Sequence, residues 1–180
     1  MVIAHKVTAG TVGGPDMGHA NTYLGWNYDG YYSNHLSVGG VQALKARGGK
    51  VIVIDIRKTP AAKNLADIFL QIKPGTDGAL ALGMGKLIID NGWADMDYVN
   101  KYVYGFEQYK ELVQQYPLDK VAEITGLDPN DIYEATKLFA TNGPACTNFS
   151  ASALVHHING FNTQRAIVCL EALTGNFDRP

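Results

Sequence analysis

The stretch KVIVID, Lys50–Asp55, is the clearest strand in this chain of 180 residues. Its four central residues are all β-branched, a composition that favours an extended backbone. No polar residue interrupts them, so both faces of the strand are expected to be buried, as in a parallel sheet. The stretch therefore predicts a parallel sheet with helices packed against it.

Other segments of strand length lie before and after this one. Strands are predicted in NTYLGWN (Asn21–Asn27), DIFLQIK (Asp67–Lys73) and ACTNFS (Ala145–Ser150). Helical patterns separate the strands, and this alternation is typical of an open α/β sheet. We therefore predict one α/β domain over residues 1–180, a Rossmann-like, open and mostly parallel sheet flanked by helices.

The helices are predicted from apolar spacing and from residues that start or stop a helix. In the segment 35–49, Leu36, Val41 and Leu44 are expected to share one face, and Gly48-Gly49 is expected to end the helix. The other predicted helices are one after Pro74–Asp77 with Leu80, Met84, Leu87 and Ile88 inward, short helices broken at Gly105, Pro117 and Gly126, one after Asp128 that ends at Asn142-Gly143, and one over residues 160–176. The first twenty residues are Gly-rich and weakly patterned.

The bulk composition excludes several classes of protein. Hydrophobic residues make up 46% of the chain, which fits a folded globular protein. A net charge of -2 gives no electrostatic reason to expect nucleic acid or an anionic membrane as a partner. No apolar run approaches 18 residues, so no membrane contact is expected from this segment. Two cysteines, Cys146 and Cys169, form neither a disulfide framework nor a metal-ligand cluster.

Polar residues and glycines follow three of the predicted strands. They occur in the segments Gly25–Asn27, Asp55–Thr59 and Pro74–Asp77. Ligands of open parallel sheets bind beyond the carboxyl ends of the strands. If the three strands are neighbours, these loops are expected to converge on one crevice.

The residue types in these loops suit a nucleotide. Gly25 allows close approach to the backbone, and Asp55 stands where acidic residues of dinucleotide folds bind ribose hydroxyls. Arg57 has the charge to neutralise phosphate. Free N–H groups at the helix start near Thr76 favour an anion. The Asp77 carboxylate has two oxygens that suit adjacent donors, such as the N1–H and amine of guanine.

Each of these residues also has a purely structural explanation. Asp77 at a helix start is favourable to the helix dipole without any ligand. A strand that ends in Asp55 is common turn chemistry, and Arg57 with Lys58 fits a solvated surface pair.

Several sharper motifs are absent or weak. GTVGGPDMG is not the G-x-G-x-x-G fingerprint, and no P-loop is present. Gly83 and Gly85 are interpreted as allowing close packing of a helix on the sheet. His156 and His157 are adjacent, which is poor spacing for two metal ligands on one helix face, and no metal site is predicted.

A longer series of segments carries a resemblance to a known family. These segments are LGWN, VIVIDIRKT, LADIFLQIKPGTDGALALGMGKLIIDNG, YVNKYVYGFEQYKELV, VAEITGLDPNDIYEATKLFA and HHINGFNTQRAIVCLEALTGNFDRP. In order and spacing they resemble the molybdopterin oxidoreductase family, the dimethyl sulfoxide reductase group. The likeness runs from about Asn21 to Pro180. Members of this group carry bis(molybdopterin guanine dinucleotide) with molybdenum or tungsten.

The resemblance implies a set of cofactor-binding residues. They are Gly25 and Asn27 from a G-x-N loop, Asp55, Arg57 and Thr59 from a D-P-R-x-T segment, Gly75, Thr76 and Asp77 from a G-T-D motif whose carboxylate grips guanine, and Ser152 and His156 near the pterin. The chain departs from the family at Tyr28 and Ile56, where proline is common, and at Ala151 and Ala153, where glycine is common. These departures weaken the pterin-side assignments more than those at guanine.

The resemblance also implies what surrounds this segment. Family members are several times longer, with an N-terminal Cys cluster that often holds an iron–sulfur centre and a C-terminal domain that grips the second pterin. The expected partners are the remaining domains of a catalytic subunit and electron-transfer subunits. The segment alone is expected to be inactive. Two alternatives stay open, namely a stand-alone nucleotide-binding module and a structural fragment without activity.

Overall fold

Four parallel strands form a single sheet in the order β3-β2-β1-β4 in the computed structural model, which describes residues 2–150 and 152–177. The strands are β1 Thr22–Trp26, β2 Lys50–Asp55, β3 Ile68–Gln71 and β4 Ala145–Phe149. In register, Gly25 of β1 lies between Val53 of β2 and Asn148 of β4. All four predicted strands are confirmed, and the fold class is α/β as predicted.

The apolar run of β2 is explained by the two cores that it separates. Ile52 and Ile54 belong to a core on one face of the sheet, whereas Val51 and Val53 belong to a second core on the other face. Each of these four side chains is at most 2% exposed. Because successive side chains of a strand point to opposite faces, a strand covered on both sides has no solvent-facing position for a polar residue.

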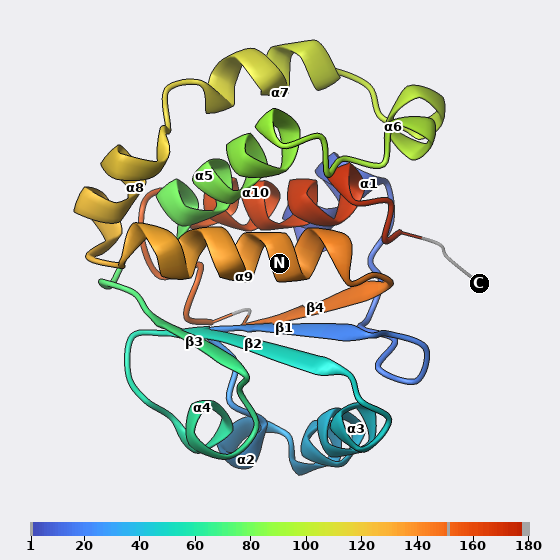
Figure 1. Ribbon diagram of the computed structural model, residues 1–180, viewed down its shortest axis with the longest axis vertical. Helices are drawn as coiled ribbons and strands as arrows, with labels where there is room; N and C mark the ends of the chain where they lie inside the picture. The colour runs from blue at the N-terminus through green and yellow to red at the C-terminus, as the bar shows by residue number, and fades with distance from the viewer. Residues whose placement is uncertain (1, 151, 178–180) are drawn as a thin grey trace.

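Two layers of helices enclose the sheet (Figure 1). In the view of Figure 1 the lower layer holds α2 Gly30–Ser33, α3 His35–Ala46 and α4 Pro60–Asn64. The upper layer holds α1 Val2–Ala9, α5 Asp77–Asp90, α6 Met96–Tyr102, α7 Phe106–Val113, α8 Leu118–Thr125, α9 Pro129–Thr141 and α10 Gly160–Leu173. Helices α9 and α10 run across the upper face of the sheet, α5 packs on them, and α7 lies above α5 (Figure 1).

Most of the predicted helix signals act as expected. The side chain of Asp128 accepts a hydrogen bond from Asn130 N at 2.8 Å, so it is the N-cap of α9. In α5, Leu80, Met84 and Ile88 are fully buried, and Leu87 is half-buried against the same core. Breaks at Gly105, Pro117 and Gly126 bound α7 and α8 as predicted.

Two expectations about the helices are wrong. Leu36 is 89% exposed, while Val41 and Leu44 are buried, because five residues of helix turn Leu36 about 140° away from Val41. Gly83 and Gly85 allow close packing between helices and not between a helix and the sheet. A Cβ on Gly83 would lie 2.6 Å from Val121 of α8, and one on Gly85 would meet the hydroxyl of Tyr109 of α7.

Helix α1 was not predicted. It packs on α10 and buries Ala4 and His5, and the His5 ring stacks on Phe149 at a centroid distance of 5.1 Å. The eight residues have weak periodicity and are followed by a glycine, so sequence patterning gave little signal. The helix depends on tertiary packing, as short helices generally do.

At the outer edge of the sheet, one backbone donor of β4 is bonded to a side chain. The backbone N–H of Ala145 donates to Asn176 Oδ1 at 2.9 Å. Asn176 follows α10 and is itself held by its backbone N–H, which donates to the carbonyl of Glu171 at 2.9 Å. A backbone donor that faces away from β1 is therefore satisfied inside this chain.

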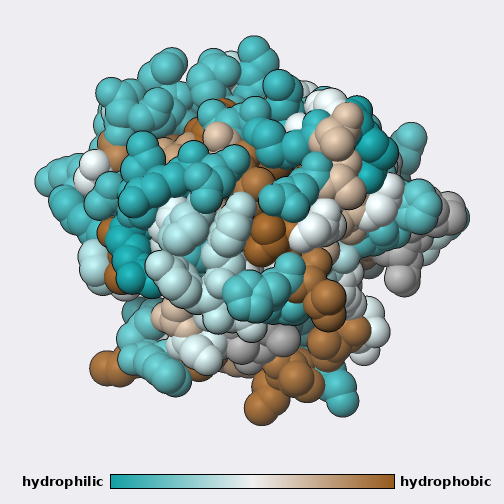
Figure 2. Space-filling model, turned by 90° about the horizontal axis from the view of Figure 1, so that it is seen from below, coloured by the Kyte–Doolittle hydropathy of each residue, from teal (hydrophilic) through white to brown (hydrophobic). Residues whose placement is uncertain are grey.

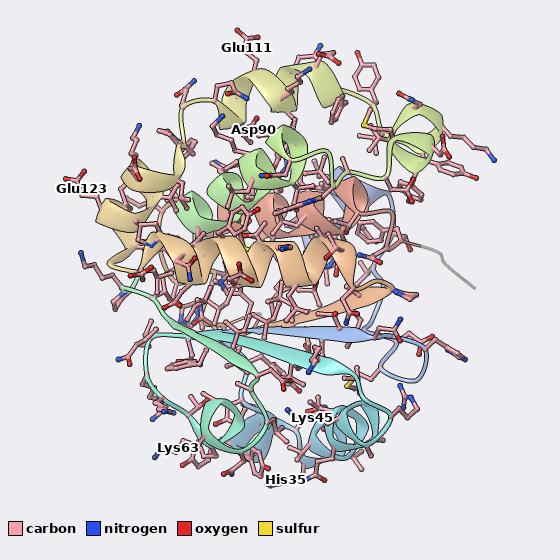
Figure 3. All side chains as sticks on the ribbon, in the orientation of Figure 1. His35, Lys45, Lys63, Asp90, Glu111 and Glu123 are labelled. Carbon is pink, nitrogen blue, oxygen red and sulfur yellow. The ribbon has the colours of Figure 1, made fainter. Side chains whose placement is uncertain are left out.

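The outer surfaces of the helical layers are polar. Glu111 and Glu123 extend outward from the upper layer, and His35 and Lys63 from the lower layer (Figure 3). Figure 2, which looks onto the lower layer, shows a mainly hydrophilic face with hydrophobic residues gathered along one margin. Within residues 2–150 and 152–177, no helix combines the length and the hydrophobicity that crossing a bilayer requires.

Candidate functional site

The ends of β1, β2 and β3 open into one cleft with a volume of about 310 Å³. Its lining comes from the three loops that the sequence singled out, from Asp29 and α2, and from one residue of the loop after β4. The lining residues are Asn27, Asp29, Tyr32, Ser33, Asp55, Ile56, Arg57, Thr59, Pro74, Gly75, Asp77 and Ala153. Because β1, β2 and β3 are neighbours, their loops converge on one cleft, as predicted.

Asp77 is the most buried carboxylate of the cleft, at 4% exposed. It begins α5, and its Oδ1 accepts hydrogen bonds from Trp26 Nε1 at 2.9 Å and from Asn27 Nδ2 at 2.6 Å. These two bonds use the lone pairs of Oδ1. Among the described residues no donor contacts Oδ2, so this oxygen is left as the acceptor available to a ligand.

Asn27 links the ends of β1 and β2 to the start of α5. It follows β1, its backbone N–H donates to the carbonyl of Ile54 at 2.7 Å, and its side chain donates to Asp77. It has a φ of 48°, and no other described residue except glycine has a positive φ. Asn tolerates this conformation better than most residues, but the conformation is costly and is common at functional sites.

Two further carboxylates lie at the ends of β1 and β2. Asp55 is 8% exposed, and desolvation by burial raises its pKa. The backbone N–H groups of Arg57 and Ile56 and the charge of Arg57 oppose that rise, while the charge of Asp29 adds to it. Asp29 is also 8% exposed, and its Oδ2 is buried without a hydrogen-bond partner among the described residues.

The two threonines of the predicted site have structural roles of their own. Thr59 is the N-cap of α4, and its Oγ1 accepts from Ala62 N at 3.2 Å. Thr76 Oγ1 donates to the carbonyl of Lys73 at 2.7 Å, so the Thr76 side chain does not cap α5. The turn before α5 uses Gly75, which has a φ of 79°. Helix α5 therefore begins without a side-chain cap.

Four predicted residues do not line the cleft, and one of them is Thr76, whose hydroxyl is bonded to Lys73. Gly25 lies inside β1, and its missing Cβ makes room for the ring of Tyr23, whose Cε1 would be 2.9 Å away. Ser152 and His156 are exposed on the loop after β4, which reaches the cleft through Ala153. Ala151, at a position where glycine is common in the family, lies outside the described residues.

Sequence reasoning missed three residues of the site. Trp26 stands inside the quoted G-x-N loop, but its role as a buried donor to Asp77 has no sequence signature. Asp29 is the N-cap of α2 and accepts from Tyr31 N at 3.0 Å. An Asp directly before a helix is a sequence signal for this role. Tyr32 is 68% exposed at the cleft and gave no pattern.

The cleft combines acceptors with one cation. Asp77 Oδ2, Asp55 and Asp29 present carboxylates, and Arg57 is an exposed guanidinium that forms no ion pair with a described residue. Such a set suits a ligand that has both hydrogen-bond donors and negative charge. Among the described residues, no three His, Cys, Asp or Glu side chains are grouped to hold a metal ion.

Known proteins resemble this chain over three quarters or more of its length. Acetylene hydratase of Syntrophotalea acetylenica is 41% identical over 178 residues, which is 96% of this chain and 24% of that protein. Probable oxidoreductase YoaE of Bacillus subtilis is 34% identical over 96% of this chain and 26% of its own length. Formate dehydrogenase H of Escherichia coli is 32% identical over 76% of this chain and 19% of its length.

The solved structure of acetylene hydratase from Pelobacter acetylenicus superposes with a TM-score of 0.91 at 38% sequence identity. The match covers 98% of this chain and 24% of that one. No protein-family model matches the chain. The chain thus spans about a quarter of the length of these relatives. It belongs to the molybdopterin oxidoreductase family, in the dimethyl sulfoxide reductase group of molybdenum- and tungsten-dependent enzymes.

Proposed function

We propose that this chain is the part of a molybdenum or tungsten oxidoreductase that holds the guanosine end of a bis(molybdopterin guanine dinucleotide) cofactor. The observation that carries the proposal is Asp77, a buried carboxylate fixed through one oxygen and open at the other, on the floor of a cleft where three strand ends meet. The family membership supplies the cofactor class.

Each residue of the cleft has a role in this proposal. Asp77 Oδ2 accepts from the N1–H and the exocyclic amine of guanine, which share one edge of the base. Asp55 accepts from the ribose hydroxyls, and Arg57 pairs with the diphosphate. Asn27 holds the Asp77 carboxylate in place through its 2.6 Å hydrogen bond.

The described residues fit a guanine nucleotide, because acceptors line the floor of the cleft and an unpaired cation lies at its rim. The cofactor itself, when bound, supplies a metal centre that changes oxidation state by two electrons. The chain contributes binding and orientation. Substrate choice and the metal ligand belong to the parts of the relatives that this chain does not span.

Calorimetric titration of the chain with GDP and with ADP tests the proposal. GDP is expected to bind at least about tenfold more tightly than ADP, because adenine lacks the paired donors that Asp77 Oδ2 would accept. Asp77→Asn is the sharpest variant. Its amide oxygen still accepts from Trp26 and Asn27, but its NH₂ replaces the open acceptor, so GDP binding should be lost without loss of fold.

The outcomes separate the candidate functions. Equal affinity for GDP and ADP would favour an ordinary nucleotide-binding module. Absence of binding to either nucleotide would favour a structural fragment. In a full-length subunit that carries this segment, Asp77→Asn should lower the molybdenum or tungsten content of the purified protein, and unchanged metal content would contradict the guanine-binding role.

A further inference from the structure

An exposed aromatic ring stands at the mouth of the cleft. Tyr32 belongs to α2, the short helix that follows β1, and its side chain lines the cleft although the residue is 68% exposed. Burial of the ring therefore does not explain its presence. A flat ring beside a nucleotide-sized cleft offers the surface on which a purine stacks.

One face of this ring is covered by a cation. The guanidinium carbon of Arg57, which follows β2, lies 5.7 Å from the centroid of the Tyr32 ring. Both residues line the same cleft, and Arg57 is itself exposed. An exposed cation–π contact is weak, so Arg57 can leave the ring at little cost. A charge-assisted hydrogen bond to a phosphate is stronger than the contact that it gives up.

We infer that Tyr32 is the stacking surface for the guanine base and that Arg57 covers this ring only until a nucleotide enters. The base then takes the place of the guanidinium on the ring, and Arg57 turns to the diphosphate. The inference rests on the proposed function and adds an aromatic contact to the polar contacts of Asp77 and Asp55.

The two residues are expected to respond to different parts of the ligand. Guanosine has the base but no phosphate, whereas GDP has both. Tyr32→Ala should weaken binding of guanosine and of GDP by about tenfold each, since it removes a stacking surface. Tyr32→Phe should bind both like the unmodified chain. Arg57→Ala should weaken GDP and leave guanosine unchanged or slightly tighter, because nothing then competes for the ring.

The chain offers a matched control. Tyr102 of α6 is 63% exposed, carries Lys101 Nζ at 4.9 Å from its ring centroid, and does not line the cleft. Tyr102→Ala should therefore leave both affinities unchanged. Thermal unfolding followed by circular dichroism checks that each variant folds.

The result separates this inference from the function on which it rests. If the unmodified chain binds guanosine and GDP but Tyr32→Ala binds guanosine equally well, the stacking role is wrong and the guanine site stands. If Arg57→Ala weakens guanosine binding as much as GDP binding, the inference that Arg57 leaves the Tyr32 ring when the base enters is wrong. If the unmodified chain binds neither ligand, the proposed function fails and this inference with it.

Discussion

The two faces of the sheet are covered very unequally. The upper core, between the sheet and α5, α9 and α10, holds 23 described residues that are buried and apolar, and the lower core holds 9. Helices α2 and α4 of the lower layer have only four and five residues, whereas α5 and α10 have 14 each. The upper face, with the larger core, is called the thick side, and the lower face the thin side. The cleft lies where the two sides meet, at the ends of β1, β2 and β3.

The residues of the cleft are likewise divided between the two faces of the sheet. Trp26 points into the upper core and donates to Asp77 at the start of α5, so the floor of the cleft belongs to the thick side. Tyr32 lies on α2 and Thr59 caps α4, so part of the rim belongs to the thin side. A segment with fewer buried apolar contacts opens at lower free energy. Asp77 is thus held on the side with the larger core, whereas Tyr32 and Thr59 at the rim lie on the side with fewer buried apolar contacts.

The largest expected loss of stability comes from truncating one leucine in each of the two cores. Leu80 of the upper core and Leu44 of the lower core are both 0% exposed. Leu80→Ala and Leu44→Ala should each lower the free energy of unfolding by about 2–5 kcal/mol. Leu80→Ala should lie at the upper end, because a large core relaxes less around a cavity. Urea denaturation measures both, and an equal or larger loss for Leu44→Ala would contradict the unequal cores.

A carboxylate of the thick side should make stability depend on pH. Glu171 of α10 is half-buried, and burial raises its pKa from 4.5 to about 7. The folded chain therefore holds this proton to higher pH than the unfolded chain. The free energy of unfolding should fall by at most about 3 kcal/mol as pH rises from 4.5 to 7.

The isosteric variant Glu171→Gln isolates this effect, since other carboxylates also titrate in the same range. The difference in unfolding free energy between the variant and the unmodified chain should change steadily between pH 4.5 and 7. A difference that does not vary with pH across this window would show that Glu171 titrates normally.

The smallest expected difference concerns two helix caps. Asp128 caps α9 on the thick side and is exposed, whereas Asp29 caps α2 on the thin side and is buried with one oxygen unpaired. Asp128→Ala should cost about 1 kcal/mol. Asp29→Ala should cost less, because it also removes a buried charge that repels Asp55. Thermal melts of both variants test this order. An equal drop in melting temperature for the two variants would contradict it.

The arrangement of strands and long helices follows from local signals in the sequence. Lys50–Asp55 is unbroken and apolar because it separates two cores, and the position of Asp128 before Pro129 defines the start of α9. Leu36 was misplaced because its spacing from Val41 fits a helix face poorly. Helix α1 was missed because it is stabilised by α10, a contact between the two ends of the chain.

The candidate site could be predicted only in outline. Parallel strands bring their carboxyl ends together, so Asn27, Asp55 and Asp77 were expected to meet. The hydrogen bond from Trp26 to Asp77 spans 51 positions, and no local pattern predicts it. The exposed Tyr32 was missed for the opposite reason, since a surface tyrosine has no periodic signature. The role of these residues in binding a cofactor remains a prediction.

The side-chain bond at Ala145 has a consequence for how such molecules associate. An open sheet edge is a template on which another chain can add a strand. Since Asn176 already accepts from Ala145 N–H, an incoming strand at this edge must first displace a ligand that the chain itself provides. The Asn176 side chain therefore competes with an incoming strand for the Ala145 N–H at this edge.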